Sequence, residues 1–243
     1  MQDNNLVTPA RALVLFDIDG TLVRRAGPHH RQALIDAVRR VTGLDTTTDN
    51  IPVHGMLDPD ILARMMQDAG ATATQIEAAM PAVIEVAQEA YEASCPDLSQ
   101  KLCPGVPQLL GSLEQRGIPM ALVTGNLTRI GWRKLERCGL RRYFRFGAFA
   151  ETAPDRTGLA RLAIERALRE GWIEPGAAIS LIGDAPSDIL AAKANRARAV
   201  AVYTGISTRE ELEALAPDKL IADLKELPVE FLLERNEKSQ NIF

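Results

Sequence analysis

Residues 13–21 read LVLFDIDGT, an apolar run that ends abruptly in two aspartates, a glycine and a threonine. A short apolar run bounded by polar turn residues predicts a buried strand. Four further runs of this kind lie at residues 120–123, 144–149, 179–182 and 200–203. Polar residues directly follow two of them, as TGN at 124–126 and GD at 183–184. We therefore expect five buried strands, several of which carry polar groups at their carboxyl ends.

Helical patterns lie between these strands, at residues 106–116, 130–138, 159–170 and 187–195. Strands that alternate with helices favour a parallel sheet with helices on both faces. The predicted fold class is therefore α/β, with a Rossmann-like core. A Ser-x-x-Glu spacing at Ser207 and Glu210 matches a helix capping box and predicts one more helix late in the chain.

The interval between the first two strands is much longer than a crossover needs. Its apolar residues recur with helical spacing at residues 30–42, 59–69 and 74–93, and no strand pattern interrupts them. We expect an all-α domain inserted at the carboxyl edge of the sheet, and Pro104-Gly105 marks the return of the chain to the core. The predicted boundaries are 1–26 and 100–235 for the core, 27–99 for the insertion and 236–243 for a flexible tail.

Composition excludes several classes of function. The 243 residues include 28 basic and 32 acidic side chains, and the basic residues form no stripe, which argues against nucleic acid as a partner. No apolar run approaches the roughly 18 residues of a membrane span. The cysteines, Cys95, Cys103 and Cys138, are odd in number and show no metal-binding spacing, which indicates a reduced, cytoplasmic protein. The oligomeric state stays open.

The polar residues that follow the strands form the candidate site. In an open α/β sheet, ligands bind outside the carboxyl ends of the strands. The residues expected to meet there are Asp17, Asp19, Thr124, Asn126, Asp184 and Asp188. Two carboxylates 4 Å apart repel each other by about 4 kcal/mol at an effective dielectric of 20, so such a cluster needs a cation. Oxygen ligands without a nearby His or Cys favour Mg²⁺.

These motifs resemble those of the haloacid dehalogenase-like hydrolases, in the branch with a helical cap inserted after the first strand. DIDGT at 17–21, Thr124 in LVTGN and GDAPSD at 183–188 match three family motifs in the family's order. The third family motif usually supplies a lysine, but no lysine lies between Lys134 and Lys193. We expect Arg156, in APDRTG, to supply that charge, with Arg161 as the alternative.

The resemblance implies a role for each residue. Asp17 would be the nucleophile and Asp19 the general acid and base. Mg²⁺ would be held by Asp17, the backbone carbonyl of Asp19 and Asp184, with Asp188 as a ligand or behind one. Thr124 would bind phosphoryl oxygens, and Arg156 would offset negative charge. The residues expected to contact the substrate are Gly20, Thr21, Gly125, Asn126 and His54, whereas His29 and His30 are expected at the surface.

The resemblance favours hydrolysis of a small phosphorylated metabolite, phosphoglycolate-like or a sugar phosphate. Dehalogenases of the family lack the second aspartate of DxD, and its phosphonatases need a cap lysine, which residues 1–100 do not contain. A phosphoglucomutase-type transfer keeps all four motifs and stays open. A non-catalytic protein that senses phosphate through Asp17 is the alternative from another class.

Overall fold

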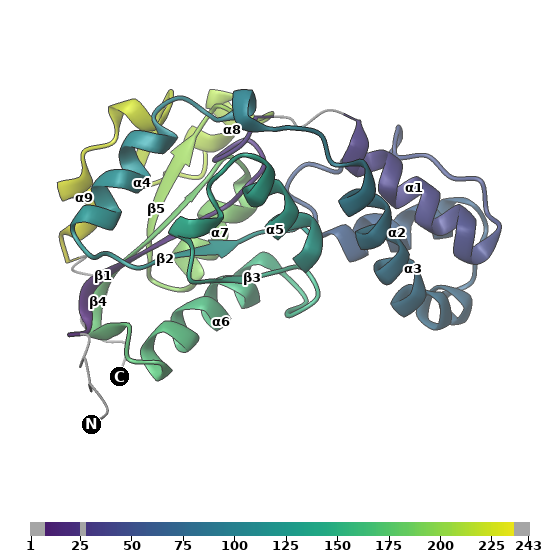
Figure 1. Ribbon diagram of the computed structural model, residues 1–243, viewed down its shortest axis with the longest axis horizontal. Helices are drawn as coiled ribbons and strands as arrows, with labels where there is room; N and C mark the ends of the chain where they lie inside the picture. Colours follow the sequence, from purple (N-terminus) through teal and green to yellow (C-terminus); the bar gives the residue numbers. More distant parts are fainter. Residues whose placement is uncertain (1–7, 25–27, 236–243) are drawn as a thin grey trace.

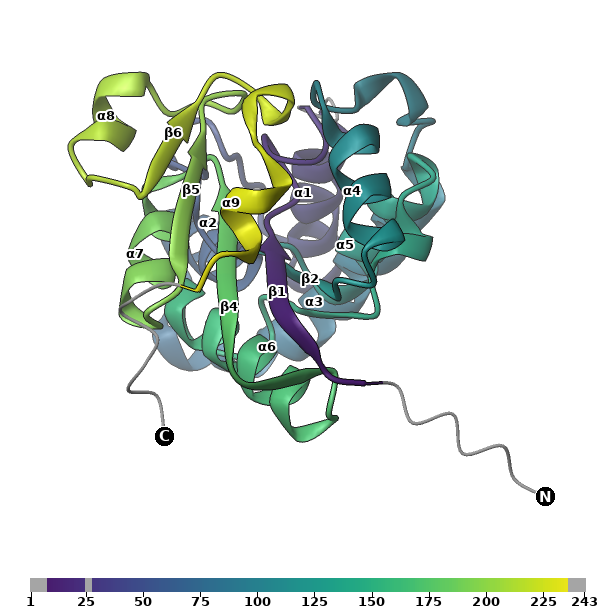
Figure 2. The ribbon, with the colours of Figure 1, turned by 90° about the vertical axis from the view of Figure 1, so that its left-hand side faces the viewer.

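The computed structural model describes residues 8–24 and 28–235. Within these residues, six parallel strands form one sheet in the order β3-β2-β1-β4-β5-β6, five of which Figure 2 labels. The strands are β1 (Ala10–Phe16), β2 (Met120–Val123), β3 (Phe146–Ala148), β4 (Ile173–Gly183), β5 (Arg198–Val202) and β6 (Lys219–Ile221). The predicted α/β, Rossmann-like fold class is confirmed.

Each of the five apolar runs forms a strand, but the sequence pattern missed β6. This strand pairs only with β5 at the edge of the sheet, and two of its three residues are partly exposed. It therefore lacks the continuous apolar run that identifies a buried strand. The pattern also missed the early residues of β1 and β4, which pair with each other from Ala10 and Ile173 onward.

Helices cover both faces of the sheet because successive strand side chains point to opposite sides. Val14 and Phe16 of β1 pack with α4 (Val106–Gln115), α5 (Thr128–Arg137) and α9 (Val229–Leu233). Leu13 and Leu15 pack with α6 (Arg156–Arg169), α7 (Pro186–Ala194) and α8 (Arg209–Glu213). Every residue of β2 is buried, as expected for a parallel strand covered on both faces.

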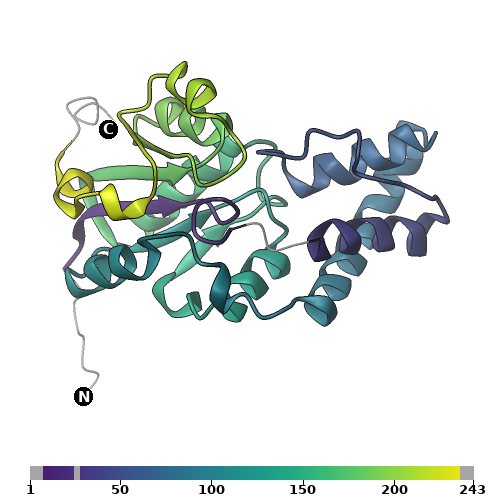
Figure 3. The same ribbon diagram turned by 90° about the horizontal axis from the view of Figure 1, so that it is seen from above.

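Three helices between β1 and α4 extend beyond the sheet on one side (Figures 1 and 3). They are α1 (His29–Thr42), α2 (Asp58–Asp68) and α3 (Ala73–Ser94), called the inserted helices below. Their apolar faces belong to the same cluster as the α4 and α5 side of the sheet. The domain boundaries themselves remain a prediction, and both the boundary at 26/27 and the tail 236–243 lie outside the described residues. In the part of the chain that is described, no helix is both long and apolar enough to cross a membrane.

The predicted late helix is present as α8, but the predicted capping pair is wrong by one residue. Thr208 is the N-cap: its hydroxyl accepts a hydrogen bond from the Glu211 backbone N–H at 3.2 Å. The Ser207 hydroxyl instead lies 2.7 Å from Nε2 of His54. Both Ser207-x-x-Glu210 and Thr208-x-x-Glu211 satisfy the spacing, so the tertiary contact with His54 decides between them.

Two helical glycines should respond to alanine in opposite ways. A Cβ on Gly131 of α5 would lie 2.7 Å from Cε1 of Phe149, whereas a Cβ on Gly111 of α4 would meet no described atom within 4 Å. Gly111→Ala should therefore raise the free energy of unfolding by about 0.5–1 kcal/mol, the usual helix-propensity gain. Gly131→Ala should lower it, because Phe149 must move.

Chemical denaturation of the two variants measures this contrast, with Gly111→Ala as the matched control. If Gly131→Ala stabilised the protein as much as Gly111→Ala does, the close packing of α5 on Phe149 would be wrong.

Candidate active site

Three buried aspartates meet at the carboxyl edge of the sheet. Asp17 follows β1, Asp184 follows the adjacent β4, and Asp188 lies in the first turn of α7. One carboxylate oxygen from each lies within 4.8 Å of those of the other two. The parallel pairing of β1 with β4 brings the ends of these strands together, as the sequence predicted.

Burial raises the pKa of all three carboxyl groups, and mutual repulsion adds to the rise for Asp17 and Asp184. Burial raises the pKa of Asp17 to about 7, against the opposing charge of Arg156. Burial, then the charges of Asp17 and Asp188, raises the pKa of Asp184 to about 9. Burial also raises the pKa of Asp188. Among the described residues, Oδ2 of Asp184 and Oδ1 of Asp188 have no hydrogen-bond partner.

This donor set fits a divalent cation. Unpartnered buried oxygens cost free energy, and hard divalent cations prefer carboxylate oxygens. Glycine is required beside the cluster: a Cβ on Gly20, whose φ is +90°, or on Gly205 would overlap the Asp184 carboxylate. The Thr21 hydroxyl donates to Oδ1 of Asp184 at 3.4 Å. The cluster is therefore closely enclosed by small residues and a hydroxyl.

Arg156 lies against the cluster as the first residue of α6. Its Nη1 donates to Oδ1 of Asp17 at 2.9 Å and to the Val123 carbonyl at 3.0 Å, and its Nε lies 3.4 Å from Oδ1 of Asp188. Burial would lower the pKa of Arg156, but the charges of Asp188 and Asp17 outweigh it and raise that pKa. Arg161, in contrast, is exposed and pairs with Glu165. Of the two candidate arginines, only Arg156 reaches the aspartates.

A second polar group surrounds Asp19. Lys134 Nζ donates to Oδ2 of Asp19 and to Oδ1 of Asn126, both at 2.6 Å. Asn126 Nδ2 donates to the same Asp19 oxygen at 2.8 Å and to the Thr124 hydroxyl at 2.7 Å. Burial would raise the pKa of Asp19, but the positive charge of Lys134 and the hydrogen bonds from Lys134 and Asn126 outweigh it and leave that pKa below its usual value.

Sequence reasoning missed Lys134 as a site residue. A lysine in an amphipathic helix is usually solvated, yet the Lys134 side chain is only 1% exposed. The available signal was its spacing, because it lies four residues after Ile130, beside Leu135, on the buried face of α5.

The inserted helices contribute two residues that the sequence did not assign to the site. His30 of α1 and Asp58 of α2 form a pair in which Nε2 lies 3.0 Å from Oδ2. The other ring nitrogen of His30 lies 3.2 Å from Nζ of Lys134. The prediction that His30 is a surface residue is wrong, because the fold brings α1 over the end of α5. Asp58 looked like an ordinary first-turn acidic residue.

His54 comes from the segment between α1 and α2. Its Nε2 lies 2.7 Å from the Ser207 hydroxyl and 3.8 Å from Oδ2 of Asp184. Burial lowers the pKa of His54, so the ring is predominantly neutral near pH 7. His54 thus lines the cavity from the inserted region. Its contact with the substrate stays a prediction.

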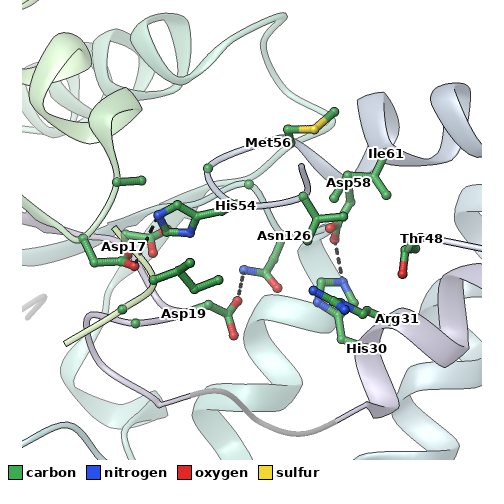
Figure 4. Close-up of a pocket in the computed structure, with 18 of the residues that line it drawn as sticks. Asp17, Asp19, His30, Arg31, Thr48, His54, Met56, Asp58, Ile61 and Asn126 are labelled. Carbon is green, nitrogen blue, oxygen red and sulfur yellow. Dashed lines mark hydrogen bonds and ion pairs between the residues drawn. The ribbon is translucent and has the colours of Figure 1, made fainter. Parts of the chain in front are cut away.

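A cavity of about 450 Å³ lies between the aspartates and the inserted helices (Figure 4). The predicted residues that line it are Asp17, Asp19, Gly20, His54, Gly125, Asn126, Arg156 and Asp184. Thr21, Thr124 and Asp188 are buried behind this lining. Figure 4 shows Arg31 and Thr48 away from Asp17, toward the inserted helices. The arrangement can hold an anion and a divalent cation close to carboxylates of different proton affinity.

The aspartate cluster predicts a pH-dependent stability of the metal-free protein. The pKa of Asp17 is about 7 and that of Asp184 about 9 in the folded protein, against 3.8 without the fold, so folding takes up protons. The free energy of unfolding should therefore fall as pH rises from 5 to 8, by up to about 1.4 kcal/mol per proton per pH unit. A divalent cation competes with these protons and should raise Tm more at pH 8 than at pH 5.

Thermal unfolding in EDTA and in excess Mg²⁺ measures both effects, with Asp184→Asn as the comparison that should flatten the pH dependence. A Tm in EDTA that rises steadily from pH 5 to pH 8 would contradict the raised pKa values.

Comparison with known proteins agrees with the geometry of the site. The family model described as haloacid dehalogenase-like hydrolase matches residues 12–195. Phosphoglycolate phosphatase 1 of Pseudomonas aeruginosa is 28% identical over 221 residues, which cover 88% of this chain and 78% of that protein. A phosphoglycolate phosphatase of Synechococcus elongatus is 32% identical over 121 residues, or 50% of this chain and 55% of that protein.

Solved structures share the fold. β-Phosphoglucomutase from Clostridium difficile superposes with a TM-score of 0.70 at 20% identity, covering 90% of this chain and 94% of that one. A predicted phosphoglycolate phosphatase from Haemophilus somnus gives 0.64 at 21% identity, covering 88% and 96%. The family match spans the aspartate motifs and the inserted helices alike. The chain therefore belongs to the haloacid dehalogenase-like hydrolases and is a phosphatase of that family.

Proposed function

We propose that this phosphatase hydrolyses a small phosphomonoester through an aspartyl-phosphate at Asp17, with Mg²⁺ as the cofactor. One observation carries the proposal: Asp17 lines the cavity while Arg156 holds its carboxylate at 2.9 Å. A carboxylate fixed in this way is oriented for attack on a bound phosphoryl group. Asp19 lines the same cavity and supplies a second carboxyl group.

The reaction has two steps. Binding of the negatively charged ester beside Asp19 favours uptake of a proton by its carboxyl group. An oxygen of Asp17 then attacks phosphorus, and the bond from phosphorus to the ester oxygen breaks while Asp19 gives that oxygen the proton. Asp19 then takes a proton from water, and the water oxygen attacks phosphorus. The bond to Asp17 breaks, and inorganic phosphate leaves. Arg156 offsets negative charge on the nucleophile and the phosphoryl group throughout.

Asp17, Asp184 and Asp188 would hold Mg²⁺, and the family resemblance adds the backbone carbonyl of Asp19. When bound, the ion supplies positive charge that offsets the carboxylates and the phosphoryl oxygens. Oδ2 of Asp184 and Oδ1 of Asp188, which accept no hydrogen bond from the described residues, support this assignment.

Gly20, Gly125 and Asn126 line the cavity, which supports them as neighbours of the phosphoryl group. Thr124 and Thr21 are fully buried. Their hydroxyls hydrogen-bond to Asn126 and Asp184, respectively, which favours a role in orienting these two side chains. A direct phosphoryl contact of the Thr124 hydroxyl stays a prediction. His54, in the segment between α1 and α2, also lines the cavity.

Within this proposal we assign a phosphoglycolate-like substrate, and Arg31 on the side of the inserted helices supports the assignment. Arg31 lines this part of the cavity, and within residues 8–24 and 28–235 it forms no ion pair. Apolar residues that also line the cavity include Leu34, Val53 and Ile61. A second anionic group on the substrate needs one cation as its partner. The sequence relatives named as phosphoglycolate phosphatases support the same substrate class.

A cytoplasmic location belongs to the same proposal. Cys95, Cys103 and Cys138 are buried and free, which suits a reducing compartment.

The test of the proposal is hydrolysis of 2-phosphoglycolate and p-nitrophenyl phosphate with Mg²⁺, with EDTA and in Asp17→Asn. Asp17→Asn should lower kcat by about 10³-fold or more without changing the fold, because the amide cannot form the acyl phosphate. EDTA should abolish turnover. Phosphate released per ester consumed, together with circular dichroism of the variant, measures these outcomes.

Full activity of Asp17→Asn would exclude the covalent mechanism. Isomerisation of a sugar phosphate without release of phosphate would identify a mutase instead. Labelling of Asp17 without turnover would identify a phosphate-sensing protein.

Arg31→Gln should separate the two ester substrates. Loss of one charged contact to the carboxylate should raise KM for 2-phosphoglycolate about tenfold, whereas KM for p-nitrophenyl phosphate should change less than about twofold. Arg40→Gln, on the exposed last turn of α1, is the matched control. Equal changes in KM for both esters would remove Arg31 as a contact for the second anionic group.

A further inference from the structure

A continuous chain of polar contacts runs from the inserted helices to Asp19. Oδ2 of Asp58 lies 3.0 Å from Nε2 of His30, and Nδ1 of His30 lies 3.2 Å from Nζ of Lys134. Lys134 ends the chain at Oδ2 of Asp19, 2.6 Å away. Figure 4 shows Asp58 joined to His30 and Asn126 joined to Asp19 across the cavity. Neither step of the proposed reaction uses Lys134, His30 or Asp58.

We infer that Lys134 is a positioning residue for Asp19, and that Asp58 holds Lys134 in place through His30. The inference rests on the proposed function, in which Asp19 protonates the leaving oxygen. It assigns the inserted helices a part in placing the acid as well as in enclosing the substrate.

The first argument is the surroundings of Lys134. An ammonium group has three N–H donors, and here three acceptors lie within reach: Asp19, Asn126 and His30. Burial of an ammonium in a 1% exposed side chain costs free energy unless every donor is used. The Tyr91 ring, 5.8 Å from Nζ, closes the remaining side. Lys134 is thus confined to one position.

The second argument is the orientation of His30. If Nδ1 accepts from Lys134, the ring proton must be on Nε2, which faces the Asp58 carboxylate. A carboxylate that accepts from one imidazole nitrogen fixes the direction of the other. The Tyr91 ring packs edge-on against His30, with centroids 5.6 Å apart. The position of Asp58 on α2 therefore fixes the orientation of the His30 ring, and the ring in turn fixes the position of the Lys134 ammonium group.

The third argument is that Asp58 reaches Asp19 by a second route. Its carboxylate accepts from the Leu127 N–H at 2.8 Å, and its own N–H donates to the Gly125 carbonyl at 2.8 Å. These bonds fix the loop after β2, which carries Asn126. Asn126 donates to the same oxygen of Asp19 that accepts from Lys134. Both routes from Asp58 therefore end on one carboxylate oxygen.

The choice of ester distinguishes positioning of Asp19 from general support of the fold. An alkoxide needs a proton as it leaves, whereas p-nitrophenolate is a weak base and leaves with little help. A variant that misplaces Asp19 should lose much more activity on ethyl phosphate than on p-nitrophenyl phosphate. A variant that merely loosens the site should lose both activities alike.

The experiment measures kcat/KM for ethyl, phenyl and p-nitrophenyl phosphate with Mg²⁺, because this ratio reports the first step and leaves out the hydrolysis of the aspartyl-phosphate that all esters share. Lys134→Met should lower kcat/KM about 100-fold on ethyl phosphate, less on phenyl phosphate and less than about tenfold on p-nitrophenyl phosphate. Lys134→Arg should recover part of the loss. Asp58→Asn and His30→Gln should show the same order of esters with smaller losses. The matched controls are Arg133→Gln on α5, which pairs with Glu136, and Asp60→Asn on α2, which is exposed.

Equal losses on all three esters, or no loss in Lys134→Met, would overturn the inference while the proposed function stands. Absence of turnover by the wild-type protein on every ester would overturn both. If Lys134→Met does not fold, as judged by circular dichroism, Lys134→Gln and His30→Gln carry the same comparison. In the double variant Asp58→Asn/Lys134→Met, the loss on ethyl phosphate should exceed that of Lys134→Met alone, because Asp58 also acts through the loop that carries Asn126.

Discussion

Four aspartates crowded at one edge of a parallel sheet are the constraint on which the rest of the site depends. Asp17 and Asp188 are compensated by Arg156 from α6, and Asp19 by Lys134 from α5. Among the described residues, the side chain of Asp184 has as hydrogen-bond or ion-pair partners only the hydroxyl of Thr21 and the more distant ring of His54. Two fixed cations therefore balance part of the negative charge. The remainder is centred on Asp184, and there we expect a divalent cation to stabilise the folded protein most.

The strand ends could be predicted from the sequence because one rule governs them all. Apolar runs mark buried strands, and parallel strands bring their carboxyl ends to one edge, so Asp17 and Asp184 had to meet. Arg156 could be predicted only as a candidate, because Arg161 on the same helix has equal charge. Arg156, the first residue of α6, is buried, whereas Arg161 is exposed. The spacing of charged residues in the sequence does not predict this difference in burial. The edge strand β6 was not predicted, because it is short and two of its three residues are partly exposed.

The contacts of the inserted helices could not be predicted in the same way. Helical periodicity identified all three helices but does not say how α1 and α2 are oriented against the sheet. His30 and Asp58 acquire their partners only through that orientation. Lys134 illustrates the same limit, since a lysine on a helix is ordinarily solvated. Its neighbours Ile130 and Leu135 share its buried face, yet only tertiary packing shows that His30 and Asp19 complete its surroundings.

The two cations differ in what holds them, and this separates the site into two halves. Arg156 is fixed by Asp17, Asp188 and the Val123 carbonyl, all of which belong to the sheet and its own helices. Asp17, the proposed nucleophile, is therefore oriented without help from the insertion. Lys134 belongs to α5, but one of its three partners is His30, which Asp58 holds from α2. The half around Asp19, the proposed acid, is thus complete only when the inserted helices are docked on the core. In the proposed mechanism, a site assembled in this way would align Asp19 at the same time as it encloses the substrate, so protonation of the leaving group would be tied to exclusion of water.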